Sequence, residues 1–202
     1  METPCSINVS QTNKTILWLW SKTGTSLAST IFSNFGFDSF DIKERELVPR
    51  CSGITQFHNC CLFKGHEEYS LIATVRNPYS RFFSDFRHNR IDIPTEEQFR
   101  DYLEYEVYKN KNQNCSGFFD RQPEYPVRLE NLFEDYSSIP FLRNSELFSS
   151  GKLLEMCEKK VNQNKKPLNW RDFYTKNLAD MVYYSCQNYF EIFGYEKDSW
   201  KK

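Results

Sequence analysis

Two short polar segments carry the residues that could do chemistry in this chain of 202 residues. The first, Ser21-Lys-Thr-Gly-Thr-Ser26, places hydroxyls, a lysine and a glycine directly after an apolar run. The second places Arg76 and Ser84 eight residues apart. Positive charge, hydroxyl groups and accessible backbone N–H groups are the means by which proteins bind phosphate. The two segments therefore predict an anion-binding site.

A strand and a helix must position the first segment. Residues 15–20 are mainly apolar without alternation, which predicts a strand covered on both faces in a parallel sheet. Apolar residues at helical spacing predict a helix over residues 27–35. An anion in the loop between them would meet free backbone N–H groups and the positive end of the helix. Gly24 would let the backbone approach that anion closely.

The second segment repeats this arrangement of strand, polar turn and helix. Residues 69–75 predict an apolar strand, and Pro78 lies where a helix can begin. Arg76 then lies at the carboxyl end of the strand, and Ser84 lies two turns into the helix. The arginine, as a charged fork, and the serine, as a hydroxyl donor, can reach one phosphate. An ion pair between Arg76 and an acid such as Asp85 is the structural alternative.

The order of residues in these segments resembles the donor-binding motifs of sulfotransferases. Lys22 precedes Gly24, so the loop departs from the Walker A order G-x-x-x-x-G-K-[ST] of kinases and ATPases. Residues 22–26 are similar instead to the 5'-phosphosulfate loop K-[ST]-G-[ST]-[ST]. Residues 76–84 resemble the 3'-phosphate motif R-[ND]-P-x-x-R-x-x-S of the same family. The matching positions of this motif are Arg76, Asn77, Pro78, Arg81 and Ser84.

Two later segments carry the resemblance along the rest of the chain. Residues 127–135 resemble the family's strand-to-helix element "EnL..D". A terminal helix closing in Tyr189-Phe-Glu-Ile-Phe-Gly-Tyr195 resembles the family's ending D-F-x-x-F-G-Y, with Tyr189 in place of the acid.

The resemblance implies an α/β protein with a three-layer, P-loop-like sulfotransferase fold and a mainly parallel central sheet flanked by helices. The alternation of strands and helices independently predicts a three-layer α/β fold with ligand loops at the strand carboxyl ends. The implied reaction moves a sulfuryl group from 3'-phosphoadenosine 5'-phosphosulfate to an acceptor hydroxyl, with a carbohydrate favoured. Adenosine 3',5'-bisphosphate is the implied product, and no metal is required.

The resemblance also assigns roles to residues. Lys22 would neutralise the charge that develops on the oxygen between sulfur and the 5'-phosphate. The 5'-phosphate of the donor would be bound by Lys22, Thr23, Gly24, Thr25 and Ser26. Its 3'-phosphate would be bound by Arg76 and Ser84. His58 is the first choice for the base that takes the acceptor proton, because it ends a candidate strand at residues 54–58 between the two phosphate motifs. His66 and Glu67 are the alternatives.

Two other classes of function stay open. A P-loop kinase or nucleotide hydrolase would need the Walker lysine after the second glycine, and a non-catalytic module could bind the donor or its product without transfer. A net charge of −1 argues against a dedicated nucleic-acid binder. Acceptor recognition is expected in residues 36–70 and 91–125, whose aromatic residues could stack on a sugar.

Length and composition predict one catalytic domain over residues 14–202 after a polar lead at residues 1–13. Thr95, followed by acids, predicts the start of a further helix. No run approaches the roughly 18 to 20 apolar residues of a membrane span. The seven cysteines, an odd number without metal-ligand spacing, are expected mainly as reduced thiols. We therefore expect a cytoplasmic protein, with a lumenal catalytic domain lacking its anchor as the alternative.

Overall fold

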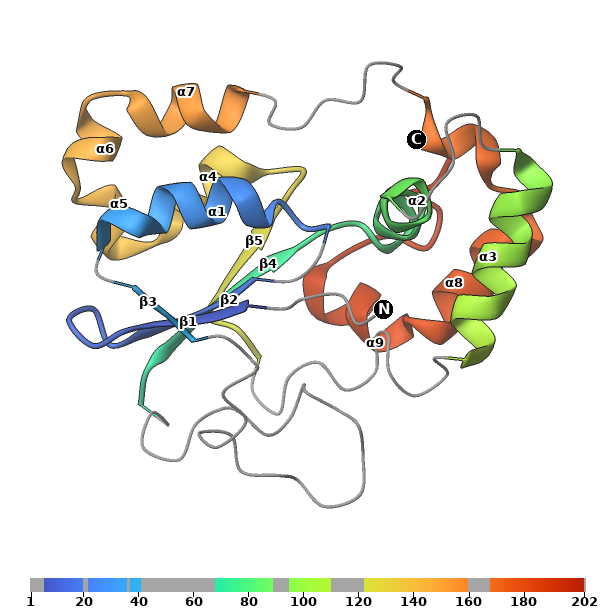
Figure 1. Cartoon of the computed structure of the whole chain (residues 1–202), viewed down its shortest axis with the longest axis horizontal. Coiled ribbons are helices and arrows are strands. Elements are labelled where there is room, and N and C mark those ends of the chain that lie inside the picture. Colours follow the sequence, from blue (N-terminus) through green and yellow to red (C-terminus); the bar gives the residue numbers. More distant parts are fainter. Residues whose placement is uncertain are drawn as a thin grey trace.

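A five-stranded sheet forms the centre of the protein in the computed structural model, which describes residues 6–19, 22–35, 37–40, 68–88, 95–109, 122–159 and 168–201 (Figure 1). Its strands are β1 (Ser6–Ser10), β2 (Thr15–Leu19), β3 (Asp38–Phe40), β4 (Ser70–Val75) and β5 (Tyr125–Arg128). The spatial order is β3-β1-β2-β4-β5. The pairs β2–β4 and β4–β5 are parallel, whereas β1 runs antiparallel to both β2 and β3. Four strands therefore point one way, and β1 points against them.

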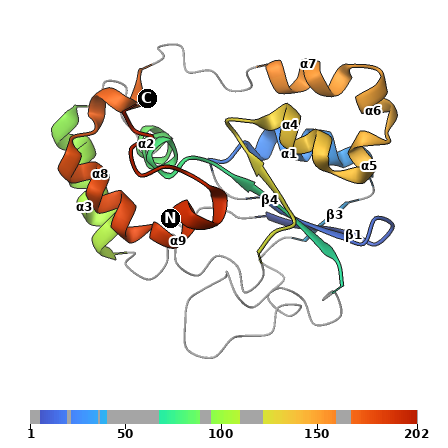
Figure 2. The same ribbon diagram turned by 180° about the vertical axis from the view of Figure 1, so that it is seen from behind.

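Helices pack against both faces of this sheet in two separate groups (Figures 1 and 2). The first group contains α1 (Thr25–Phe32), the 3-10 turn Ser33–Phe35, α4 (Leu132–Ser138), α5 (Pro140–Arg143), α6 (Glu146–Ser149) and α7 (Lys152–Glu158). The second contains α2 (Pro78–His88), α3 (Glu96–Lys109), the 3-10 turn Trp170–Phe173, α8 (Lys176–Ser185) and α9 (Gln187–Phe193). The predicted α/β class with helices on both sides of the sheet is confirmed.

Strand β2 shows why its sequence is apolar without alternation. Leu17 and Leu19 pack into the core with α1 and α4, while Ile16 and Trp18 pack into the core with α2, α8 and α9. All four side chains are at most 2% exposed. Burying each such side chain stabilises the fold by about 1.5–3 kcal/mol. The strand is thus covered on both faces, as its sequence predicts.

Ser6–Ser10, which lie inside the polar lead expected over residues 1–13, form β1. This strand pairs with β2 along its whole length, from Ser6 opposite Leu19 to Ser10 opposite Thr15. Its apolar Ile7 and Val9 alternate with polar residues, which is the pattern of a strand, and Val9 is 2% exposed. Since β1 lies between β2 and β3, the folded domain includes residues before 14.

The predicted helices are present, with changed bounds. The helix expected over residues 27–35 begins at Thr25 and ends in a 3-10 turn at Ser33–Phe35. Thr95 caps α3 as expected, because its hydroxyl accepts the N–H of Gln98 at 3.2 Å while the Gln98 side chain accepts the Thr95 N–H at 3.1 Å. The expected terminal helix is divided into α8 and α9 at Cys186. In the described ranges, none of the helices has the length and apolar character needed to cross a membrane.

Two cysteines differ in state. Cys157 is a free thiol, and burial raises its pKa to about 11. Cys186 is buried and disulfide-bonded. The expectation of reduced thiols therefore does not hold for Cys186.

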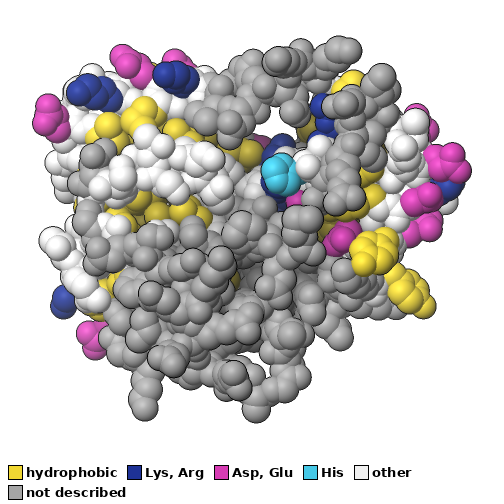
Figure 3. Space-filling model, in the orientation of Figure 1, with side chains coloured by type: hydrophobic (Ala, Val, Ile, Leu, Met, Phe, Trp, Pro, Cys, Tyr) yellow, Lys and Arg dark blue, Asp and Glu magenta, His cyan; other side chains and the backbone are white. Residues whose placement is uncertain are grey.

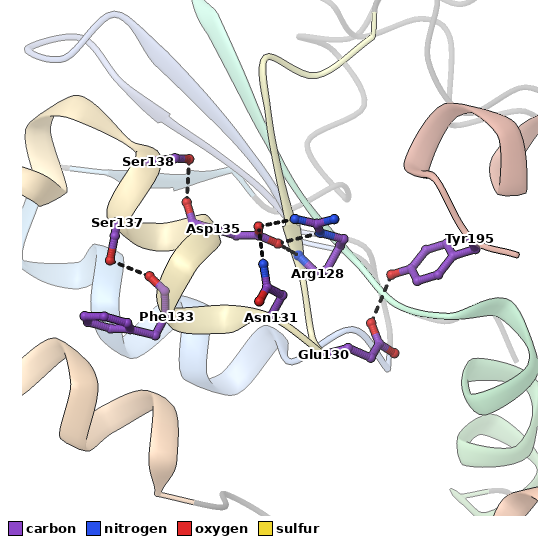
Figure 4. A network of polar contacts seen from close by, with 8 residues as sticks. All are labelled: Arg128, Glu130, Asn131, Phe133, Asp135, Ser137, Ser138 and Tyr195. Atoms are coloured by element: carbon purple, nitrogen blue, oxygen red, sulfur yellow. Dashed lines mark hydrogen bonds and ion pairs between the residues drawn. The ribbon is translucent and has the colours of Figure 1, made fainter. Parts of the chain in front are cut away.

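A charged network fixes the turn between β5 and α4 (Figure 4). The Asp135 carboxylate accepts hydrogen bonds from the backbone N–H of Arg128 at 2.7 Å and from its guanidinium at 2.6 and 2.9 Å. Asn131 donates a further bond to the same carboxylate at 3.0 Å. The Asp135 side chain is only 8% exposed, so these donors replace its lost water. The turn that leads to Glu130 is held in place by this network.

Replacing Asp135 by Asn should lower the free energy of unfolding by about 2–4 kcal/mol, because the amide removes the charge and sets an N–H group against the Arg128 donors. Urea denaturation measures this loss. Asp198→Asn is the matched control, since Asp198 is 62% exposed and pairs with Lys201 at the surface. Its loss should stay under about 0.5 kcal/mol. Equal losses in the two variants would contradict the structural role of the buried network.

Candidate anion-binding site

The two polar segments of the sequence meet at one edge of the sheet. β2 and β4 are parallel neighbours, in register from Thr15 opposite Ser70 to Trp18 opposite Ala73. Lys22 follows the carboxyl end of β2, and Arg76 directly follows the carboxyl end of β4. In the space-filling view, basic side chains lie beside a hollow between the two helix groups, whereas acidic side chains gather over α3 (Figure 3). The fold thus brings together the two segments that the sequence singles out.

The Arg76 guanidinium connects the two segments. Its Nε donates to the hydroxyl of Ser80 in the first turn of α2 at 2.8 Å. Its Nη1 donates to the backbone carbonyl of Lys22 at 3.2 Å. The Lys22 backbone adopts a left-handed conformation with φ of 64°, which is uncommon for a residue with a side chain. The guanidinium is therefore oriented before any ligand binds.

Thr23 provides a second connection, between the loop after β2 and strand β4. Its hydroxyl lies 2.6 Å from the hydroxyl of Thr74 on β4, and the residue is fully buried. The Thr23 hydroxyl thus points into the protein and ties the loop to the neighbouring strand.

Gly24 forms the turn into α1. It is the N-cap of the helix and has a φ of 87°, a conformation that glycine adopts without strain. A Cβ at this position would lie 2.9 Å from Cδ1 of Leu129, in the turn after β5. Thr25 and Ser26 occupy the first two positions of α1, whose first turn holds no acid. The backbone N–H groups at this end of the helix and its dipole favour an anion.

Burial and neighbouring negative charges shift the pKa values of Lys22 and Arg76 in opposite directions. Burial lowers the pKa of Lys22, the negative charge of Asp85 raises it, and the positive charge of Arg76 lowers it. Burial also lowers the pKa of Arg76, which Glu130 raises and Arg81 lowers. Arg76 is thus repelled by Lys22 and by Arg81 in a place where burial also opposes its charge. A bound anion would relieve this repulsion.

The helix α2 carries the other residues of the second motif. Ser84 lies two turns into α2, partly buried, as the sequence predicts. Arg81 is 8% exposed, and its guanidinium lies 5.2 Å from the centre of the Phe82 ring. The Asp85 carboxylate accepts a hydrogen bond from the Tyr102 hydroxyl at 2.7 Å. Asp85 thus bonds to Tyr102, whereas the Arg76 guanidinium bonds to the Ser80 hydroxyl and to the Lys22 carbonyl.

Several predicted residues lie outside the described part of the chain. These are the three candidate bases His58, His66 and Glu67, together with the candidate strand at residues 54–58. Most of the expected acceptor-binding segments also lie outside it. Within the described ranges, no three side chains of His, Cys, Asp or Glu gather as metal ligands do.

Two residues that sequence reasoning gave no role lie against Arg76 and Asn77. The Tyr189 hydroxyl accepts the backbone N–H of Arg76 at 3.1 Å, and the Glu130 carboxylate accepts that of Asn77 at 2.9 Å. Both residues belong to segments that resemble the family, but only the folded chain shows that they meet the same turn.

Comparison with known proteins adds nothing to this description: the chain matches no protein-family model, no curated protein and no solved structure. Two partly desolvated cations, a glycine turn and a helix N-terminus at adjacent strand ends suit a ligand with more than one phosphate or sulfate group.

Gly24→Ala should weaken anion binding more than its effect on stability explains. Alanine at this position must adopt a left-handed backbone conformation, which costs about 1–2 kcal/mol, and its Cβ requires the Leu129 side chain to shift. Gly151→Ala is the matched control, because Gly151 has a φ of 77° with no atom within 4 Å of the added Cβ. Urea denaturation and titration with adenosine 3',5'-bisphosphate measure both effects. If Gly151→Ala weakened the titration equally, the loop at Gly24 would have no special part in binding.

Proposed function

We propose that this protein is a sulfotransferase that uses 3'-phosphoadenosine 5'-phosphosulfate, with the P-loop-like fold of that family. One observation carries the proposal: the Arg76 guanidinium is fixed between Ser80 and the Lys22 carbonyl, so both motif segments form one cationic site. A donor with phosphate groups at both ends of its ribose needs two such positions, joined at a fixed spacing. The order of residues in both segments supports the same donor.

The residues divide between the two ends of the donor. The backbone N–H groups of residues 23–26 and the hydroxyls of Thr25 and Ser26 would hold the 5'-phosphate at the N-terminus of α1. Thr23 would contribute through its backbone, since its hydroxyl is engaged by Thr74. Arg76 and Ser84 would hold the 3'-phosphate, which distinguishes this donor from ATP.

In the proposed transfer, the acceptor oxygen forms a bond to sulfur while the bond between sulfur and the bridging oxygen of the 5'-phosphate breaks. The electron pair of the broken bond stays on that bridging oxygen, and the Lys22 ammonium stabilises it. The acceptor proton goes to a base, for which His58 is the first proposal and His66 and Glu67 are the alternatives. Transfer of this kind depends on how the donor is oriented and on how its developing negative charge is stabilised. Cations held in fixed positions, as Arg76 is, would therefore account for much of the rate acceleration.

The acceptor class and the compartment are also proposals. We favour a carbohydrate hydroxyl as acceptor, from the resemblance to carbohydrate sulfotransferases. The disulfide at Cys186 favours an oxidising compartment such as a secretory lumen over the cytoplasm, because cytosolic thiols are kept reduced.

Adenosine 3',5'-bisphosphate should raise the melting temperature, while AMP should have little effect at the same concentration. A ligand at 100 times its dissociation constant adds about 2.7 kcal/mol of stability, which shifts a chain of this length by roughly 5–10 °C. Arg76→Ala should abolish the selectivity for the bisphosphate. Differential scanning fluorimetry measures both. Stabilisation by ATP-magnesium alone would support a P-loop kinase or hydrolase, and no shift with any nucleotide would contradict the donor site.

Sulfate from labelled donor should appear on soluble oligosaccharides in an acceptor panel that also contains phenols. Lys22→Ala should lower the rate of transfer about 10²–10³-fold, because it removes the charge that meets the leaving oxygen. The bisphosphate should still stabilise this variant through Arg76. Preferential labelling of phenols would contradict the carbohydrate assignment, and transfer that is unchanged in Lys22→Ala would contradict the role of Lys22.

A further inference from the structure

Side chains from distant parts of the chain bind two consecutive backbone N–H groups beside the anion site. The N–H of Arg76 donates to the Tyr189 hydroxyl, across a sequence separation of 113 residues. The N–H of Asn77 donates to Oε1 of Glu130, across a separation of 53 residues. Each N–H group is therefore satisfied within the protein, and an anion at this turn must be bound by the Arg76 side chain.

These two contacts belong to one closed network. The Tyr195 hydroxyl donates to the other carboxylate oxygen of Glu130 at 3.0 Å (Figure 4). The Tyr195 ring stacks on the Tyr189 ring, with centroids 6.2 Å apart and planes inclined by 6°. Tyr189 is 1% exposed, so its ring is fixed by packing in the core. The network begins at the backbone N–H of Arg76 and ends at the backbone N–H of Asn77.

The segment after α9 adds two further contacts to the same turn. The Asn77 side chain donates to the Ser199 hydroxyl at 2.8 Å. The Tyr79 hydroxyl donates to the backbone carbonyl of Lys197 at 2.6 Å. The backbone from which the Arg76 guanidinium extends is therefore held from α9, from the residues that follow it, and from the turn after β5.

We propose that Glu130 and Tyr189 are positioning residues for anion binding by Arg76. They hold the Arg76–Asn77 turn so that the guanidinium stays between Ser80 and the Lys22 carbonyl when no ligand is bound. A group ordered in advance loses less conformational freedom on binding, so affinity rises. We call the hydrogen bonds of Tyr189 and Glu130 to the N–H groups of Arg76 and Asn77 the brace. The identity of the anion rests on the proposed function, whereas the existence of the brace does not.

The effect of the Glu130 hydrogen bonds on anion binding can be separated from the effect of its negative charge. A carboxylate close to Arg76 repels an incoming anion, so Glu130 can favour binding only through the hydrogen bonds that it accepts. Glu130→Gln and Glu130→Ala both remove the charge, but the glutamine retains an acceptor for the Asn77 N–H group. Comparison of these two variants therefore isolates the hydrogen bond from the charge.

The dissociation constant of adenosine 3',5'-bisphosphate should be about fivefold or more higher for Glu130→Ala than for Glu130→Gln, as expected for one lost hydrogen bond. Isothermal titration calorimetry measures the constants. Equal constants in the two variants would overturn the role of Glu130.

Tyr189→Phe tests the second positioning residue with a matched control. Tyr174→Phe also removes one buried hydroxyl that bonds to the backbone, here the Tyr79 carbonyl at 2.8 Å. Both variants should lose similar stability, but only Tyr189→Phe should weaken bisphosphate binding. Equal weakening by both would show a general effect of lost stability and would overturn the role of Tyr189.

Amide hydrogen exchange tests the brace without a ligand. The amides of Arg76 and Asn77 should exchange faster in Tyr189→Phe and in Glu130→Ala than in the wild type, and should be unchanged in Tyr174→Phe. Pro78 has no amide, so these two N–H groups are readily separated from those of α2. Unchanged exchange would overturn the brace. If the wild type bound no bisphosphate, the proposed function would fail, and exchange would still decide whether the brace exists.

Discussion

Parallel pairing of β2 with β4 decides where every other part of the site can lie. In a parallel pair the carboxyl ends fall at the same edge, so the loop after Leu19 and the turn after Val75 must meet. Two contacts then make this proximity specific. The Thr23 and Thr74 hydroxyls join the first loop to the second strand, and Arg76 reaches back to the Lys22 carbonyl. A change of register between the strands would separate both pairs.

Burial opposes the charges of the cations at the site, and nearby acids favour them. Lys22, Arg76 and Arg81 hold like charges in a partly buried place, and burial opposes the charged form of both Lys22 and Arg76. The two nearby acids are each held by tyrosine hydroxyls, Asp85 by Tyr102 and Glu130 by Tyr195. These acids moderate the repulsion without forming close ion pairs with Arg76. A site of this kind gains most from a ligand that brings its own negative charge.

The sequence predicts the central strands, the helices that follow them and the convergence of the two polar segments, because hydrophobic pattern and turn residues are local signals. It does not predict β1, since only Ile7 and Val9 interrupt a polar stretch. It does not reveal that the Thr23 hydroxyl turns inward, because side-chain direction in a loop depends on its neighbours. The contacts of Tyr189 and Glu130 with the Arg76–Asn77 turn depend on tertiary packing that no local pattern contains.

The contacts around Arg76 also bear on the order in which the chain can fold. They join residues separated by 54, 113 and 122 positions, so the site is made of highly non-local contacts. Such contacts form late, since the entropy of closing long loops is lost before the contacts stabilise the chain. The same holds for one face of the sheet, since Ile16 and Trp18 of β2 share their core with residues of α8 and α9, Tyr189 among them. Competence to bind the anion is therefore expected to require the segment that carries Tyr189 and Ser199 to be folded onto the Arg76–Asn77 turn.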